Sequence, residues 1–163
     1  MKTKTLFFVF ILSACFVYSQ NEEVNYFIGE WNLQLWNKGN KTEVPDLIAK
    51  WKVESGLDST FCLIGNVQID GMDFTKEMIT FNPYSKEYVR TIAANTGSYF
   101  TLFSSGWKGD KLIWRGNQFD SDKKTELKVE IVKVSQNEFK ATYFKFLNNE
   151  WIQTEKEVLK RII

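Results

Sequence analysis

Apolar and polar residues alternate along most of the chain from residue 31 onward. Trp31, Leu33 and Leu35 alternate with polar neighbours, and residues 47–53 repeat the same two-residue period. Successive side chains of a β-strand point to opposite faces, so this period predicts half-buried strands. Strands are expected at residues 31–35, 47–53, 61–69, 75–82, 87–94, 98–105, 111–118, 125–134, 138–147 and 151–161.

The segments between these strands are short and rich in turn-forming residues. Asp70-Gly71 is a hairpin signal, and Pro83 fixes a backbone angle in the turn at residues 82–85. About ten short strands with hairpin-length links favour an all-β fold, an antiparallel up-and-down β-barrel. Closure into a barrel removes the exposed strand edges of an open sheet. A β-sandwich is the alternative.

The start of the barrel is expected around Gly29 and Trp31. Residues 21–28 fit a short N-terminal helical turn that leads into Gly29. Glycine tolerates a positive φ and close backbone approach, so the chain can turn tightly there and lay Trp31 across one barrel end. Gly65, on the inward face of the strand at 61–69, relieves crowding or bends that strand.

The first nineteen residues predict an export signal. A basic segment is followed by an apolar run at residues 6–16 and a small-residue cleavage site before Gln20. The domain assignment is therefore a signal peptide at 1–19 and a single barrel domain at 20–163, in a periplasmic or secreted protein. The apolar run is too short for a transmembrane span. Alternatively, residues 12–15 resemble a lipobox, which would make Cys15 the lipid anchor of a membrane-attached lipoprotein.

Composition excludes several kinds of partner and chemistry. Removal of Lys2 and Lys4 with the signal changes the formal charge from +1 to −1, so no basic field for nucleic acid is expected. Histidine is absent, which removes the commonest metal ligand and the usual neutral-pH base. We therefore expect no metal, no cofactor and no catalytic residues. Cys62 has no histidine to activate it and is not expected to be a nucleophile.

The candidate ligand-binding residues are aromatic or basic. Tyr88 and Arg90 share one face of the strand at 87–94 and, if that face is inward, offer a hydroxyl and a cation to an anionic head group. The general preference of arginine for solvent favours the opposite orientation, with Arg90 outward. Tyr143 either extends its hydroxyl into a cavity or is a core tyrosine with a satisfied hydroxyl. The inward tryptophans Trp51 and Trp114 complete the set.

Glu155 and Glu157 lie two residues apart on one face of the last strand. They could do acid–base chemistry only if they were desolvated. Because Lys156 lies between them, the pattern favours a solvent-facing pair.

Gly29-x-Trp31 near the first strand and Arg161 at the end of the last resemble the calycin superfamily, which includes lipocalins and fatty-acid-binding proteins. The resemblance implies that the Arg161 guanidinium lies over the Trp31 ring as a structural bracket. Three segments carry a closer resemblance: Gly29-Glu30-Trp31, residues 81–89 and Leu159-Lys160-Arg161. Through them the chain resembles, from Tyr26 to Arg161, a bacterial lipocalin-like family, domain of unknown function 1579. That family usually has Gly-Tyr-Asp where residues 80–82 read Thr-Phe-Asn, and it brings no catalytic residues.

Three functional hypotheses follow. The first is an exported, non-catalytic barrel that binds a small apolar or amphipathic molecule in its lumen, because small barrels either fill with side chains or hold one ligand. The second is a filled barrel that acts as a structural or interaction module of the cell envelope. The third is an isomerase or cyclase, which requires an inward ionisable group with a shifted pKa beside a cavity.

Overall fold

The computed structural model describes residues 24–56 and 62–163. The predicted signal at 1–19, Cys15 and Phe61 lie outside the described residues. Within the described part, no helix has the length and apolar character needed to cross a membrane.

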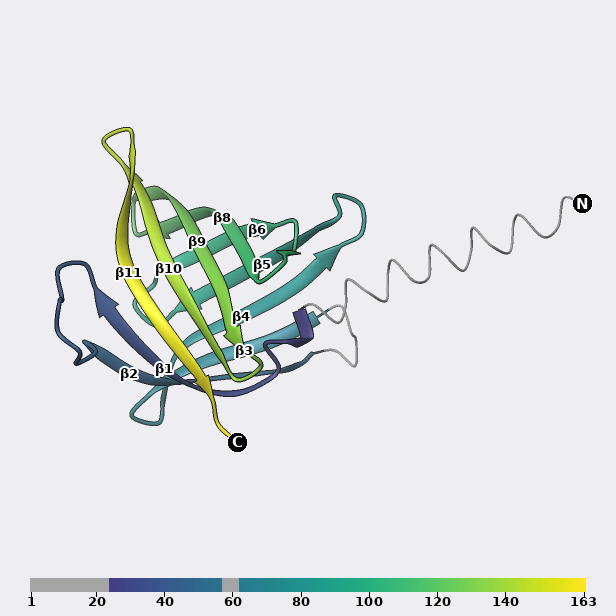
Figure 1. Cartoon of the computed structure of the whole chain (residues 1–163). Coiled ribbons are helices and arrows are strands. Elements are labelled where there is room, and N and C mark those ends of the chain that lie inside the picture. Colours follow the sequence, from purple (N-terminus) through teal and green to yellow (C-terminus); the bar gives the residue numbers. More distant parts are fainter. Residues whose placement is uncertain (1–23, 57–61) are drawn as a thin grey trace, which may run out of the picture.

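Strands account for most of the described residues (Figure 1). In chain order they are β1 (Gly29–Asn37), β2 (Leu47–Ser55), β3 (Cys62–Ile69), β4 (Met72–Asn82), β5 (Glu87–Ala94), β6 (Tyr99–Ser104), β7 (Trp107–Lys108), β8 (Lys111–Asp120), β9 (Lys123–Ser135), β10 (Glu138–Leu147) and β11 (Glu150–Arg161). The ten longer strands match the ten predicted ones. The two-residue strand β7 lies in a segment expected to be a connection.

The strands form one antiparallel sheet that closes on itself. The order is β6-β5-β4-β3-β2-β1-β11-β10-β9-β8-β7, and β6 also pairs with β8. The first and last long strands, β1 and β11, lie side by side (Figure 1). This closure confirms the predicted up-and-down barrel and excludes the β-sandwich.

Gly116 permits the closing contact between β6 and β8. It pairs with Leu102, and a Cβ at this position would overlap the carbonyl oxygen of Thr101. A larger residue would therefore push the two strands apart at the seam.

Aromatic side chains fill one end of the barrel. Residues 24 and 25 are helical, as predicted for the short N-terminal turn, and the turn that follows carries Phe27 into the core. Phe27, Trp31 and Phe139 are at most 2% exposed. The Trp31 and Phe139 rings meet edge to face at 4.9 Å, and Phe27 approaches Trp51 at 5.7 Å. Such contacts stabilise the fold beyond the burial of apolar area.

Arg161 ties this end of the barrel together. It pairs with Trp31 across β1 and β11, and its guanidinium carbon lies 4.2 Å from the centre of the Trp31 ring. It donates hydrogen bonds to the carbonyl oxygens of Tyr26, at 2.7 Å, and of Ile28. Gly29 has a φ of +131°, and a Cβ there would lie 2.5 Å from Arg161 Nη1. Glycine is thus required both for the backbone angle and for the arginine.

Replacing Trp31 by alanine should destabilise the barrel strongly. The ring is fully buried and donates a hydrogen bond from Nε1 to the Phe27 carbonyl oxygen at 2.8 Å. The free energy of unfolding should fall by about 3–5 kcal/mol, measured by urea denaturation. The control is Trp36→Ala, because Trp36 is on the same strand but only half-buried. Equal losses in the two variants would contradict the structural role of Trp31.

Candidate functional site

The lumen contains a cavity of about 190 Å³. Its wall is largely apolar, with Leu33, Val67, Phe100, Leu127 and Phe139 among the residues that line it. Five ionisable side chains also line it: Glu77, Arg90, Lys145, Glu155 and Glu157. The barrel is therefore not completely filled by its own side chains.

Glu77 on β4 and Arg90 on β5 form a buried ion pair in the cavity wall. Glu77 Oε2 accepts a hydrogen bond from Arg90 Nε at 2.7 Å and lies 2.6 Å from Arg90 Nη2 in the ion pair, and Glu77 Oε1 accepts a hydrogen bond from Trp51 Nε1. The Glu77 side chain is 2% exposed and that of Arg90 12%. The geometry satisfies the carboxylate with three donors, as a buried charge requires.

The ion pair keeps Arg90 charged. Burial acts to lower the pKa of Arg90, but the charge of Glu77, with smaller contributions from Tyr143 and Glu157, outweighs it and leaves the pKa above its ordinary value. Arg90 is therefore a permanent cation whose charge is largely neutralised by Glu77.

Gly65 on β3 makes room for this pair. It lies opposite Glu77 in the sheet, and a Cβ at position 65 would come within 2.5 Å of Glu77 Oε1. Gly65 was expected to relieve crowding, and in the structure its missing side chain leaves room for the Glu77 carboxylate.

A second polar pair joins β10 to β11. The Tyr143 hydroxyl donates a hydrogen bond to Glu157 Oε2 at 3.0 Å. Burial raises the pKa of Glu157 from its ordinary 4.5 to about 7, although the Tyr143 hydrogen bond and the charge of Arg90 act in the opposite direction. Burial, followed by the charge of Glu157, raises the pKa of Tyr143 well above its ordinary value. Glu157 can therefore gain or lose a proton near neutral pH, whereas Tyr143 stays protonated.

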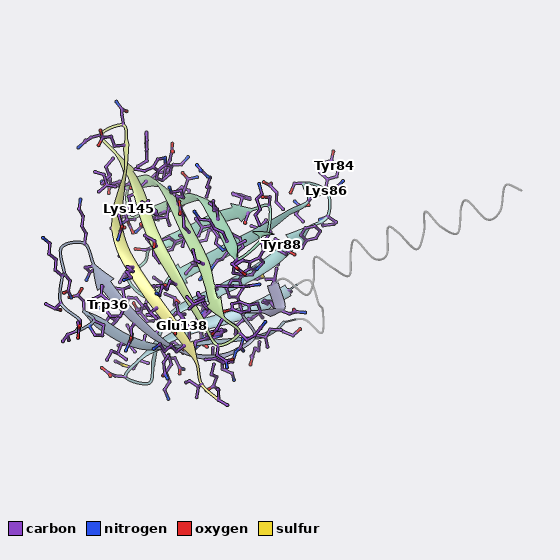
Figure 2. All side chains as sticks on the ribbon, viewed as in Figure 1. Trp36, Tyr84, Lys86, Tyr88, Glu138 and Lys145 are labelled. Atoms are coloured by element: carbon purple, nitrogen blue, oxygen red, sulfur yellow. The ribbon has the colours of Figure 1, made fainter. Side chains whose placement is uncertain are left out.

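Glu155 and Lys145 lie nearer the β10–β11 hairpin. Burial raises the pKa of Glu155, and the charge of Lys145 partly offsets the shift. Figure 2 shows Lys145 toward this end of the barrel and Glu138 toward the other.

The structure brings three of the five predicted ligand-binding residues to the cavity. Trp51, Arg90 and Tyr143 line it. Tyr88 and Trp114 are instead buried in the surrounding core, 5% and 1% exposed, and Tyr88 packs against Phe81 with ring centres 5.1 Å apart.

Two expected orientations are wrong. Arg90 does not face solvent, because Glu77 neutralises it inside the barrel. Glu157 does not face solvent either: it is 9% exposed and holds the Tyr143 hydroxyl. Glu77 was missed, although a sequence signal existed. It shares a strand face with the apolar Ile79 on β4, as Arg90 shares one with Ile92 on β5, so opposite charges fall on the inward faces of adjacent strands.

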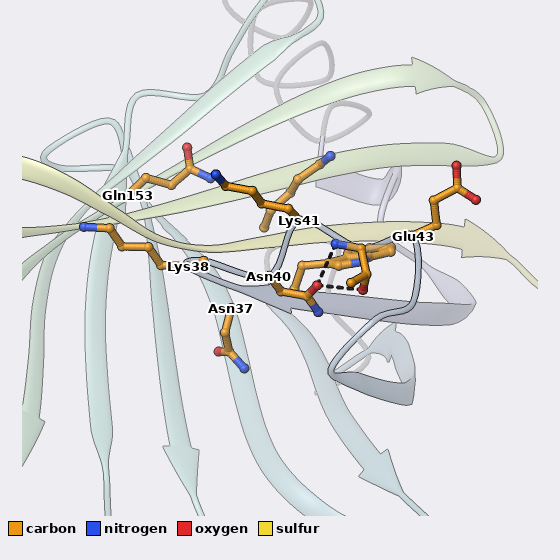
Figure 3. Close-up of a pocket in the computed structure, with 10 residues that line it drawn as sticks. Asn37, Lys38, Asn40, Lys41, Glu43 and Gln153 are labelled. Carbon is orange, nitrogen blue, oxygen red and sulfur yellow. Dashed lines mark hydrogen bonds between the residues drawn. The ribbon is translucent and has the colours of Figure 1, made fainter.

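A second pocket lies outside the barrel, between the loop after β1 and strand β11. Its volume is about 710 Å³, and Lys38, Lys41, Glu43, Gln153 and Lys156 are among the residues around it. Figure 3 shows the Asn40 side chain bonded to Thr42 within this loop. The loop side chains are mostly exposed, so this hollow offers no desolvated polar group.

Comparisons with known proteins show little similarity. No protein-family model matches the sequence, and no curated protein matches it. Among solved structures, the chain is similar to EF1p2_mFAP2b bound to DFHBI, with a TM-score of 0.43 and 12% identity over 88% of this chain and 99% of that one. Because similarity at this level carries no functional argument, the fold assignment rests on the strand pairing described above.

The raised pKa of Glu157 should make stability depend on pH. Between pH 4.5 and about 7 the folded state binds more protons at Glu157 than the unfolded state does. The stabilising contribution of this residue is therefore complete below pH 4.5 and is lost as the pH rises through about 7. Glu157→Gln should remove this dependence.

Urea denaturation at several pH values between about 4.5 and 7.5 tests this. Relative to wild type, Glu157→Gln should gain about 3 kcal/mol in free energy of unfolding across the range. Glu150→Gln, an exposed change on the same strand, should run parallel to wild type. Parallel curves for wild type and Glu157→Gln would show that Glu157 titrates normally.

Proposed function

We propose that this chain is an exported, non-catalytic, lipocalin-like barrel that binds one small apolar or amphipathic molecule in its lumen. The observation that carries the proposal is the cavity, which has largely apolar walls and a few charged groups. Ligand sites in proteins commonly combine these two features. A solid core, which a purely structural barrel would have, leaves no such space.

The cavity volume sets the size of the ligand. At about 190 Å³ it is smaller than the roughly 300–1,000 Å³ of pockets for drug-sized molecules. An apolar cavity of about 150 Å³ holds benzene. The ligand is therefore a single ring or a short chain.

The family and the compartment belong to the same proposal. The proposed relation to the calycin superfamily, and through it to the lipocalin-like family of unknown function, is supported by Arg161 lying over the Trp31 ring beside Gly29, as the calycin resemblance implies. Export is supported by the sequence of residues 1–19, with lipidation at Cys15 as the alternative route.

A second candidate function is proton transfer within the lumen, as in an isomerase or cyclase. The observation that favours it is Glu157, whose pKa of about 7 suits a general base. Incubating the protein with the molecule that co-purifies from its natural host would distinguish the two functions. A binding protein returns that molecule unchanged, whereas an enzyme converts it in a reaction that Glu157→Gln abolishes.

Filling the cavity should abolish binding. Ala141 is 2% exposed and lines the cavity, so Ala141→Phe places a ring in it. Benzene, toluene and n-hexanol should raise the melting temperature of wild type, and the shift should disappear in Ala141→Phe. Ala93→Phe, an exposed substitution, is the matched control and should keep the shift.

Overpacking can itself destabilise a core by about 1–3 kcal/mol, so Ala141→Leu provides a milder variant. It should reduce the shift without removing it. Wild-type protein that shows no shift with any of the three probes, and carries no small molecule when purified from its host, would refute lumen binding.

A further inference from the structure

The charges in the cavity wall do not balance. Three carboxylates, Glu77, Glu155 and Glu157, line the cavity together with two cations, Arg90 and Lys145. With all five ionised, the wall has a formal charge of −1. An anionic head group would make the total charge of wall and ligand −2 in a poorly hydrated space, whereas a cationic head group would bring it to zero. Uncompensated charge is costly where the effective dielectric constant is low.

Arg90 is the obvious anchor for an anion, but its charge is already matched. Two of its nitrogens bond to Glu77 Oε2, at 2.7 Å and 2.6 Å. An incoming anion would be repelled by the Glu77 carboxylate that lies beside the guanidinium. The ion pair therefore offers little net attraction to either sign of charge.

Glu157 lines the same space and has an acceptor oxygen that Tyr143 does not occupy. The residue is nine-tenths buried. Its Oε2 accepts the hydrogen bond from Tyr143, whereas its Oε1 accepts none from the residues that the structure describes. Tyr143 has only one proton to donate and cannot satisfy both oxygens. A ligand that carries a donor can therefore hydrogen-bond to the second oxygen of this carboxylate.

We propose that the lumen selects a small amphipathic amine, whose protonated head group donates to Glu157 while its apolar part occupies the space between the apolar walls. This inference rests on the proposed ligand-binding function and specifies its ligand class. The volume limits the apolar part to a single ring or about six carbons.

Binding of such an amine should depend on pH through Glu157. The groups that act on this carboxylate are Tyr143 from β10, Arg90 from β5, Glu77 from β4 and its strand neighbour Glu155. Burial places the pKa of Glu157 at about 7. The ammonium needs the ionised form, so affinity should fall up to about tenfold per pH unit below 7 and level off above it. An alkylammonium keeps its own charge throughout this range, as a lysine side chain does.

Three probes of equal chain length test the proposal: n-hexylammonium, n-hexanol and hexanoate. Isothermal titration calorimetry on the wild-type chain at pH 8 should give the tightest binding for hexylammonium, at least about tenfold tighter than hexanol, with hexanoate weakest. At pH 6 the advantage of hexylammonium should shrink about tenfold while hexanol binding stays constant. Methylammonium, which lacks the apolar chain, should not bind measurably.

Two variants test whether the preference for hexylammonium depends on Glu157. Glu157→Gln should remove the preference for hexylammonium over hexanol and its pH dependence, whereas Glu150→Gln should keep both. If Glu157→Gln fails to fold, Tyr143→Phe replaces it. That variant leaves the Glu157 carboxylate without its internal donor, so hexylammonium should bind at least as tightly as in wild type.

Each remaining outcome overturns the inference. Tighter binding of hexanoate than of hexylammonium would make Arg90 the anchor, refuting the amine assignment while leaving lumen binding intact. A preference that survives Glu157→Gln would place the amine elsewhere. Failure of all three probes to bind at millimolar concentration would refute the proposed function along with the inference.

Discussion

The pairing of the first strand with the last is the contact on which the barrel depends. β1 and β11 are separated by more than a hundred residues of chain, so their association costs considerable loop-closure entropy before any contact compensates for it. Trp31 and Arg161 meet at this pairing, with the guanidinium 4.2 Å from the ring centre and hydrogen-bonded to the chain that precedes β1. The closed end of the barrel, and with it the floor of the lumen, is held by these contacts.

Once the barrel is closed, any charge on an inward face must find its partner inside. Glu77 does so with three donors from Trp51 and Arg90, and this pair is complete in itself. Glu157 does so only in part, because Tyr143 occupies one of its two oxygens. The contrast separates the two carboxylates by role. The first is part of the architecture of the wall, whereas the second retains the capacity to bind a donor.

Much of the fold follows from residue alternation. The two-residue period, together with the turn-forming residues between the segments, predicts all ten long strands. β7 could not be predicted because a two-residue strand is too short to show a period.

The orientation of the charged residues was harder to predict. The general preference of charged residues for solvent predicts that Arg90 and Glu157 face outward. That preference describes a residue in isolation, and a partner inside the barrel reverses it. For Arg90, the inward orientation can be predicted only from the positions of Glu77 and Arg90 together, on adjacent strands. The cavity could not be predicted, because its volume depends on side-chain packing, which the periodicity of the sequence does not show.

The glycine opposite Glu77 has a consequence for how this lumen could change during evolution. A methyl group at position 65 would collide with the Glu77 carboxylate in its present position, so a side chain there would displace the carboxylate and disturb its ion pair with Arg90. A relative that combined a side chain at position 65 with a smaller residue at position 77 would leave Arg90 without its counter-charge and available to anions. Paired substitutions on β3 and β4 would thus change the charge that the cavity wall presents, without altering a single residue of the barrel's closed end.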